Sequence, residues 1–223
     1  MKKGMQTKRD HGRGRGPSTK DVAPADTKSV APRDTKDRTP LASTVESLKK
    51  LYEDDLKDIY WAENHLLGVL PRMASAAESP ELRVAFEDHL AQTKNHVARL
   101  KHVFESSGLK VTAKKCEAMD GLTKEGDEVI ERHAKGCVRD TGLIIAGQKV
   151  EHYEIAAYGS LRTLAQVLKL DEAAGVLQET LDEEGNANRL LTGLSRTINE
   201  QALNQVGGVK SAASAVPHPG GKP

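Results

Sequence analysis

The sequence predicts an all-α protein, an antiparallel four-helix bundle with one long crossover between its second and third helices. Leu, Ala and Val supply most of the apolar residues, and aromatic residues make up 3% of the chain, a composition that suits helices packed on one another. Four long segments repeat their apolar residues with helical period. A connection too long for a tight turn, residues 109–136, separates the second of these segments from the third.

The first helix is expected over residues 43–77. Ser43, with Glu46 three residues later, forms a capping-box pattern at its start. Pro71 lies inside the segment and should kink or break the helix, because proline lacks an N–H and crowds the preceding turn. The stripe expected to face the core is Tyr52, Leu56, Ile59, Glu63, Leu66, Leu70 and Met73. Glu63 is the one charged member of that stripe.

The second helix is expected to begin with Ser79 as N-cap and Pro80 in the first helical position, and to stop at Gly108. Its stripe is Leu82, Phe86, His89, Thr93, His96, Leu100 and Val103. Two histidines, His89 and His96, therefore occupy the middle of a largely apolar face.

The crossover is predicted to contain a short helix near residues 122–133, and the third long helix is expected over residues 138–168. The stripe of the third helix is Leu143, Gly147, Val150, Glu154, Ala157, Leu161, Leu164 and Leu168. Glu154 is the one acid in it, and Glu151 lies one turn earlier beside the same face.

The fourth helix is expected to be capped by Asp171 and to end near Gln201, with Glu184 at a stripe position where leucine would be expected. A bundle whose second and third helices are joined by one long crossover is the ferritin-like arrangement. Residues 43–201 are therefore predicted to form a ferritin-like domain. The flanking residues 1–42 and 202–223 are predicted to be disordered tails, because they hold few large apolar side chains.

The charge of the chain is unevenly distributed. Residues 1–40 contain 11 Lys and Arg against 5 Asp and Glu, a charge of +6, and the rest of the chain carries −5. A basic tail favours weak contact with nucleic acid, although a solvated tail without a partner explains the same charge. No apolar run is long enough for a signal peptide or a membrane span, which predicts a cytoplasmic protein without membrane contact. Cys116 and Cys137 are too far apart for a zinc finger and are expected to be reduced thiols.

Each of the four long helices places a metal-binding type of side chain near the middle of its buried stripe. A buried carboxylate is costly unless it is paired or bound to metal, and no Lys or Arg falls on the central turns of these stripes. Carboxylates with one or two imidazoles suit iron or manganese, with zinc as an alternative. The sequence thus predicts a site for one or two ions, with candidate ligands Glu63, His89, His96, Glu151, Glu154 and Glu184.

Each candidate also has a purely structural interpretation. Glu63 fits an acid at the core edge that is hydrogen-bonded to Tyr or His, and His89 and His96 fit core histidines with satisfied hydrogen bonds. One of Glu151 and Glu154 can face solvent. The coincidence on four helices favours the metal site over these separate explanations.

A family resemblance lies in five segments: DIYWAE at 58–63, LPRM at 70–73, KCEAM at 115–119, VEHYEIAAYG at 150–159 and QETLDEE at 178–184. Together they resemble the YciE/YciF stress-protein family of ferritin-like proteins, over about residues 48–200. The resemblance implies an antiparallel bundle that forms homodimers and is related to rubrerythrins and other di-iron carboxylate proteins. It also implies a role in the bacterial stress response.

The ferritin-like ligand pattern has Glu on the first and third helices and Glu-x-x-His on the second and fourth. The matching positions here are Glu63, then His96, then Glu151 or Glu154, then Glu184.

Two positions depart from that pattern. Thr93 stands three residues before His96, where Glu is expected, and Ala187 stands three residues after Glu184, where His is expected. His89 and the second acid of the Glu151-x-x-Glu154 pair can compensate. The predicted site is therefore an acid-rich, histidine-poor variant, for which the sequence assigns no catalytic residue.

Three functions fit the sequence. The first is a ferritin-like stress protein that binds iron or manganese, with oxygen or peroxide redox activity if a metal position is open to such a molecule. The second is a metal-free helical dimer that acts through protein interactions. The third is a protector of nucleic acid that uses residues 1–40. The core acids favour the first, and whether the protein is an enzyme stays open at this point.

Overall fold

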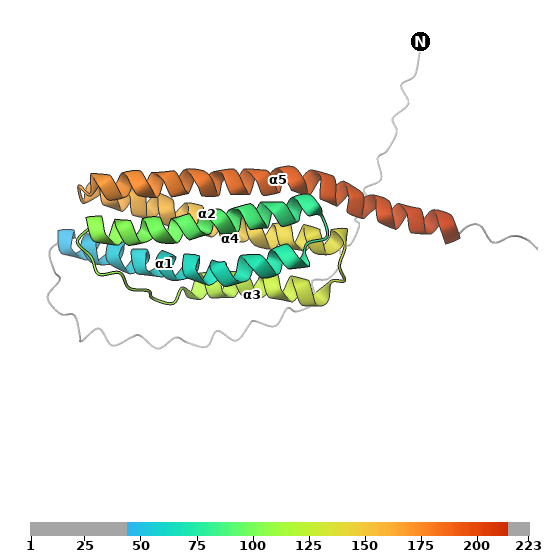
Figure 1. Ribbon diagram of the computed structural model, residues 1–223, viewed down its shortest axis with the longest axis horizontal. Coiled ribbons are helices and arrows are strands. Elements are labelled where there is room, and N and C mark those ends of the chain that lie inside the picture. Colours follow the sequence, from blue (N-terminus) through green and yellow to red (C-terminus); the bar gives the residue numbers. More distant parts are fainter. Residues whose placement is uncertain (1–43, 214–223) are drawn as a thin grey trace, which may run out of the picture. The chain divides into compact units, whose positions relative to one another are not determined.

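The computed structural model describes residues 44–213, with side chains described for residues 44–204. The described part of the chain folds into five helices: α1 (Thr44–Ala76), α2 (Pro80–Ser106), α3 (Glu117–Arg132), α4 (Cys137–Val167) and α5 (Asp171–Ala213). Four of them, α1, α2, α4 and α5, form the bundle, and the shorter α3 lies on its outside against α4 and α1 (Figure 1). The predicted all-α bundle, with a short helix in its crossover, is confirmed.

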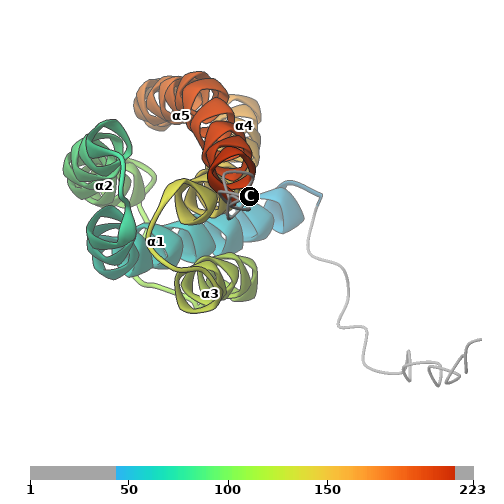
Figure 2. The ribbon, with the colours of Figure 1, turned by 90° about the vertical axis from the view of Figure 1, so that its right-hand side faces the viewer.

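Two helical hairpins make up the bundle. Residues 77–79 join α1 to α2, and residues 168–170 join α4 to α5, so each pair is antiparallel. The hairpins meet where α2 packs on α5 and α1 packs on α4, which closes a ring of four helices around one core (Figure 2). The connection through α3 brings the chain from one hairpin to the other.

Local capping signals define the start and end of α2 as the sequence predicts. The Ser79 hydroxyl accepts a hydrogen bond from the Leu82 amide, and Gly108 has a φ of 69° just after the helix end. In addition, the buried Asp140 carboxylate accepts hydrogen bonds from the amides of Glu78 and Ser79, both at 2.8 Å. Asp140 thereby ties the α1–α2 turn to the first turn of α4.

The sequence predicts a kink or a break at Pro71. Helix α1 continues through Pro71 without a break, because the flanking Leu70 and Met73 are buried and tertiary packing holds the helix together. One expected cap differs from the structure. Asp171 is the first residue of α5 rather than the cap that precedes it. The predicted N-cap Ser43 lies outside the described residues.

Helix α5 extends further than the sequence indicated. Its predicted end was Gln201, whereas the helix continues to Ala213. The glycine pair at Gly207 and Gly208 does not end it, since each glycine costs about 1 kcal/mol in a helix, far less than proline does. The first proline after this pair is Pro217.

The core lies between the inward faces of the four long helices. Its largest fully buried side chains include Tyr52, Leu56, Ile59, Leu100 and Leu161, all from the predicted stripes. Within the described residues, no helix is long and apolar enough to cross a membrane.

Candidate metal centre

The four long helices bring the six predicted ligands together in the middle of the bundle. Helix α1 contributes Glu63, α2 contributes His89 and His96, α4 contributes Glu151 and Glu154, and α5 contributes Glu184. All six are buried, with relative exposures of 5% or less. Spacings of three and seven residues place each pair on one helix face, which is why both members of a pair reach the core.

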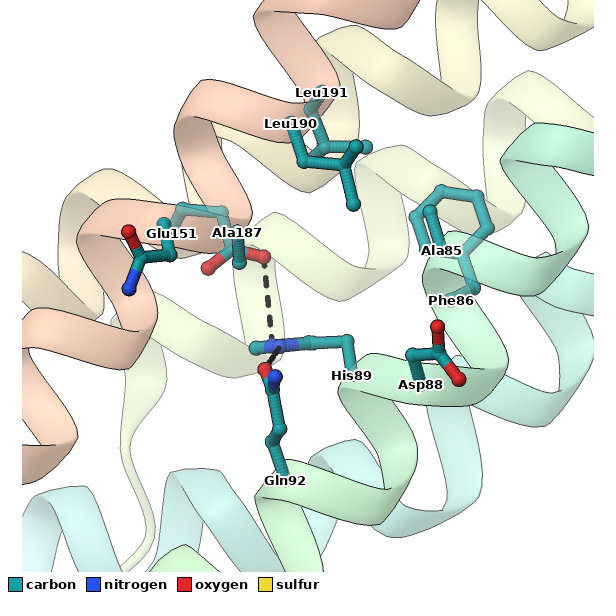
Figure 3. Close-up of a pocket in the computed structure, with 10 residues that line it drawn as sticks. Ala85, Phe86, Asp88, His89, Gln92, Glu151, Ala187, Leu190 and Leu191 are labelled. Carbon is teal, nitrogen blue, oxygen red and sulfur yellow. Dashed lines mark hydrogen bonds and ion pairs between the residues drawn. The ribbon is translucent and has the colours of Figure 1, made fainter.

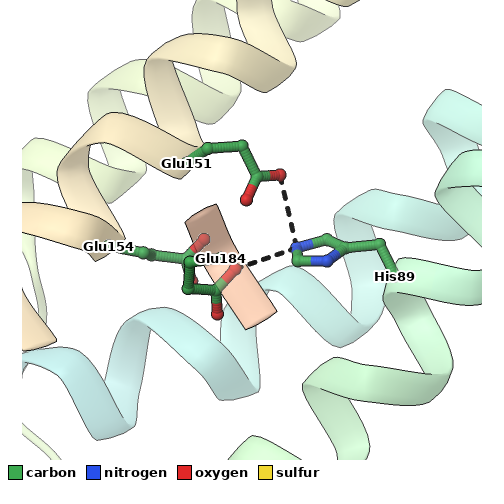
Figure 4. Close-up of side chains that lie close together, drawn as sticks. All are labelled: His89, Glu151, Glu154 and Glu184. Carbon is green, nitrogen blue, oxygen red and sulfur yellow. Dashed lines mark ion pairs between the residues drawn. The ribbon is translucent and has the colours of Figure 1, made fainter. Parts of the chain in front are cut away.

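The donor atoms fall into two groups that share one residue. The His89 group is His89, Glu151, Glu154 and Glu184 (Figure 4), and the His96 group is Glu63, His96 and Glu184. Within each group the donor atoms lie within 4.8 Å of one another, close enough for one ion to contact them all. Glu184 has one oxygen for each group, because Oε2 is 3.8 Å from His89 Nε2 and Oε1 is 2.9 Å from His96 Nδ1.

Most of these donor atoms have no hydrogen-bond partner. Among the described side chains, the buried atoms without a partner are Glu63 Oε2, His89 Nε2, His96 Nδ1, Glu151 Oε2, both oxygens of Glu154 and of Glu184, and Nε of Arg83 and Arg162. The 2.9 Å contact between His96 and Glu184 lacks the angles of a hydrogen bond. Each such atom costs about 1–3 kcal/mol. A divalent metal ion fits this donor set, because it binds carboxylate oxygen and imidazole nitrogen alike.

Burial favours the protonated form of three of the four glutamates in the cluster. Burial raises the pKa of Glu151 and Glu154 well above the usual range, with a further increase from the neighbouring Glu184, and burial also raises the pKa of Glu63. Burial lowers the pKa of His96, but its contacts with Glu184 and Glu63 outweigh that effect and raise the pKa to about 10. Burial tends to raise the pKa of Glu184, but its contacts with His96 and His89 outweigh that effect and lower the pKa.

A second layer of side chains holds His96. Its Nε2 lies 2.7 Å from Glu183 Oε2, so a proton on Nε2 donates to that carboxylate, and in the neutral ring the Nδ1 lone pair then faces Glu63 and Glu184. The Arg99 guanidinium in turn donates to both oxygens of Glu183, at 2.7 and 2.9 Å, and lowers the pKa of Glu183. This chain of contacts orients His96 and, when the ring is neutral, favours the tautomer with its proton on Nε2.

His89 is held less firmly. Its Nδ1 faces Gln92 Oε1 at 3.4 Å, near the upper limit for a hydrogen bond, and its Nε2 lies 3.4 Å from Glu151 Oε1. A cavity of about 250 Å³ borders His89 and Glu151 on the side of α5 (Figure 3). The His89 group therefore has open space beside it.

Tyr158 and Thr93 complete the surroundings of the centre. The fully buried Tyr158 hydroxyl donates to Glu63 Oε1 at 2.5 Å. Thr93 stands where the ferritin-like pattern has an acid, and its hydroxyl donates back to the carbonyl of His89 at 2.9 Å. The Thr93 hydroxyl is therefore bonded to the backbone of its own helix, α2.

Known proteins resemble this chain over most of its described length. The profile of the family described as "Domain of unknown function (DUF892)" matches residues 47–204. The chain belongs to the DUF892 family. Protein YciF of Escherichia coli (strain K12) is 43% identical to this DUF892 protein over 163 residues, which span 72% of this chain and 98% of YciF. The predicted YciF-type family membership is confirmed.

Solved structures agree with the DUF892 assignment. The crystal structure of the E. coli stress protein YciF matches with a TM-score of 0.67 and 44% identity, and covers 69% of this chain and 97% of that chain. YcfI from Rhodopseudomonas palustris matches with a TM-score of 0.64 and 35% identity over 69% and 98% of the two chains. A protein from Xanthomonas campestris, 21% identical with a TM-score of 0.57, shares the fold.

Sequence reasoning overlooked Glu183 and Arg99. Glu183 belongs to an acidic run next to Glu184 that reads as a solvated helix face. It contacts His96 and Arg99, which lie 87 and 84 residues away in the chain. No local pattern connects positions so far apart, so only the packing of α2 against α5 shows this contact.

Proposed function

We propose that this DUF892 protein binds two divalent metal ions, iron or manganese, between the hairpins of its bundle. One ion takes its ligands from the His89 group and the other from the His96 group, with Glu184 contributing to both. The observation that carries this proposal is the set of unpartnered buried atoms. Eight of the ten such atoms belong to the six candidate ligands.

The charge of the site supports two ions rather than one. Its four glutamates carry four negative charges when ionised, and two divalent cations balance them, whereas one cation leaves two of these charges to be neutralised by protons. Hard carboxylate oxygens with two imidazoles suit iron and manganese, and zinc is the alternative to exclude. When bound, such ions supply electron exchange with oxygen or peroxide. The relative YciF is described as a stress protein, and we extend that setting to this chain.

Metal analysis tests the proposal. Protein purified without chelator and reconstituted with Fe(II) or Mn(II) should hold about two equivalents by elemental analysis. A double variant, Glu63→Ala with Glu154→Ala, removes a ligand from each group and should lose most of that metal. The control Glu105→Ala changes an exposed acid on α2 and should match the parent. Equal metal in the parent and the double variant would overturn the proposal.

Glu63→Leu separates a metal site from a merely costly core acid. If Glu63 serves no ligand, an apolar side chain of similar size should raise the free energy of unfolding, with or without metal. If Glu63 is a ligand, the variant should lose the stabilisation that added metal gives the parent. Thermal unfolding with and without Mn(II) measures both quantities. If the variant is more stable than the parent, and if Mn(II) stabilises the two proteins equally, the result favours the metal-free interpretation.

The basic segment, residues 1–40, carries a second candidate function. It lies outside the described residues, and its charge of +6 favours salt-dependent contact with nucleic acid. Deletion of residues 1–40 should abolish salt-sensitive retention on a DNA column while leaving metal content unchanged. Retention that survives the deletion rejects this function.

The homodimer likewise stays a prediction, which sedimentation of the full chain checks.

A further inference from the structure

The cavity beside the His89 group has an apolar wall and a polar floor. Its volume is about 250 Å³, and its lining includes Phe86, Leu190 and Leu191 on the apolar side. His89 and Glu151 also line it, facing each other from α2 and α4 (Figure 3). Leu190 is half exposed, so the cavity reaches toward the protein surface.

Two unpartnered atoms belong to residues that line this cavity. His89 Nε2 and Glu151 Oε2 are both buried without a hydrogen-bond partner. The cavity is therefore lined by two residues that each have an unpartnered buried atom, unlike a purely apolar packing defect in a core.

Ala187 explains why the space exists. It lines the cavity from α5 and lies one turn after Glu184, the position at which the ferritin-like Glu-x-x-His pattern carries a histidine ligand. Alanine leaves unfilled the volume that an imidazole side chain would take. The fourth helix thus provides room for a ligand of the His89 group without supplying the ligand itself.

We propose that this cavity is a binding site for a small uncharged donor molecule, which supplies to the ion of the His89 group the ligand that Ala187 does not. This inference rests on the proposed metal binding. The size range extends from hydrogen peroxide or dioxygen up to an imidazole ring, since cavities of about 150 Å³ already admit benzene. Anions are disfavoured, because Asp88 lines the cavity and adds a negative charge beyond the four that the two ions balance.

Imidazole serves as the probe, in protein loaded with Co(II) and at a pH at which free imidazole is neutral. Titration should change the visible absorption of the bound cobalt in a saturable way. Ala187→Leu fills the cavity without adding a donor atom, so it should keep the cobalt content and weaken imidazole binding by about tenfold or more. Ala98→Leu, at an exposed position of α2, is the matched control and should bind imidazole as the parent does.

Ala187→His tests the same idea in the opposite direction. The new imidazole side chain should give the cobalt spectrum of the imidazole-saturated parent without any added imidazole, and further titration should change nothing. Equal imidazole affinity in the parent and in Ala187→Leu would overturn the inference while leaving the metal site intact. A parent protein that binds no cobalt would instead reject the proposed function, and the inference with it.

Discussion

The two halves of the centre are built from the same residue types but are held very differently. In the His96 group the imidazole is fully buried, and Glu183 and Arg99 fix its orientation from behind. In the His89 group the imidazole has one long contact with Gln92 and borders a cavity. For the proposed metal site, this comparison favours a division of labour, in which the preorganised half would retain its ion and the open half would exchange a small ligand.

Replacing the shared residue should have the largest effect, because it removes a ligand from both halves. Glu184→Gln keeps the shape and removes the charge, and both ions should bind at least about 100-fold more weakly, more than the loss of an outer-shell partner costs. His89→Ala should instead lose about one equivalent and leave the His96 group near parent affinity. Competition with a fluorescent chelator measures both. A Glu184→Gln protein with one ion at parent affinity shows that the halves are independent.

Replacing the residues that support the two histidines should have the next largest effect and should distinguish the two halves. Glu183→Gln weakens the acceptor that orients His96, and one ion should bind about 10–100-fold more weakly. Gln92→Ala removes only the 3.4 Å contact with His89, so metal affinity should fall less than tenfold. A weak hydrogen bond contributes about 1 kcal/mol. Calorimetric titration with Mn(II) compares them. Similar losses in the two variants contradict the division of labour.

The metal-free protein should become less stable as the pH rises. Folding raises the pKa of His96 from 6.5 to about 10, so between these values the folded protein holds a proton that the unfolded chain has released. The stabilisation is present in full below pH 6.5 and is lost as the pH rises toward 10, by up to about 1.4 kcal/mol per pH unit. The raised pKa values of Glu151 and Glu154 act in the same direction.

Urea unfolding of chelator-treated protein across this pH range measures the slope. His96→Gln should flatten it, and saturating Mn(II) should reverse it, because metal binding requires deprotonated ligands. A slope that is unchanged in His96→Gln places its origin elsewhere in the molecule.

The effect of removing the Tyr158 hydroxyl should be confined to the His96 half. Tyr158→Phe takes away the donor to Glu63 Oε1 and should lower the free energy of unfolding of the metal-free protein by about 1–3 kcal/mol. Imidazole binding beside His89 should not change. Loss of that binding in Tyr158→Phe shows that the halves communicate through more than Glu184.

Helical period and local signals made much of the fold predictable. Glu63 and Glu184 stood out because each interrupts an apolar stripe, and Ser79 with Pro80 marked the start of α2. The sequence left open whether both acids of α4 face inward, since a three-residue spacing fits a core face and its edge equally. The structure buries both Glu151 and Glu154 on the core face, whereas His152 of the same turn is exposed.

Features that depend on distant packing were not predictable in the same way. The Glu183 and Arg99 contacts connect α5 to α2, and the cavity lies where Phe86 of α2, Glu151 of α4 and Ala187 of α5 meet. The end of α5 was misplaced for a local reason, namely that glycine was weighed as a terminator where it is only a modest penalty.

The origin of the ligands in two hairpins has a consequence for folding. Glu63, His89 and His96 come from the first hairpin, whereas Glu151, Glu154 and Glu184 come from the second, and each group draws on both. Bound ions would therefore act as cross-links between the two hairpins, in addition to the crossover through α3. We expect the loaded bundle to unfold as one cooperative unit, and the metal-free bundle to open first along the seam between its hairpins.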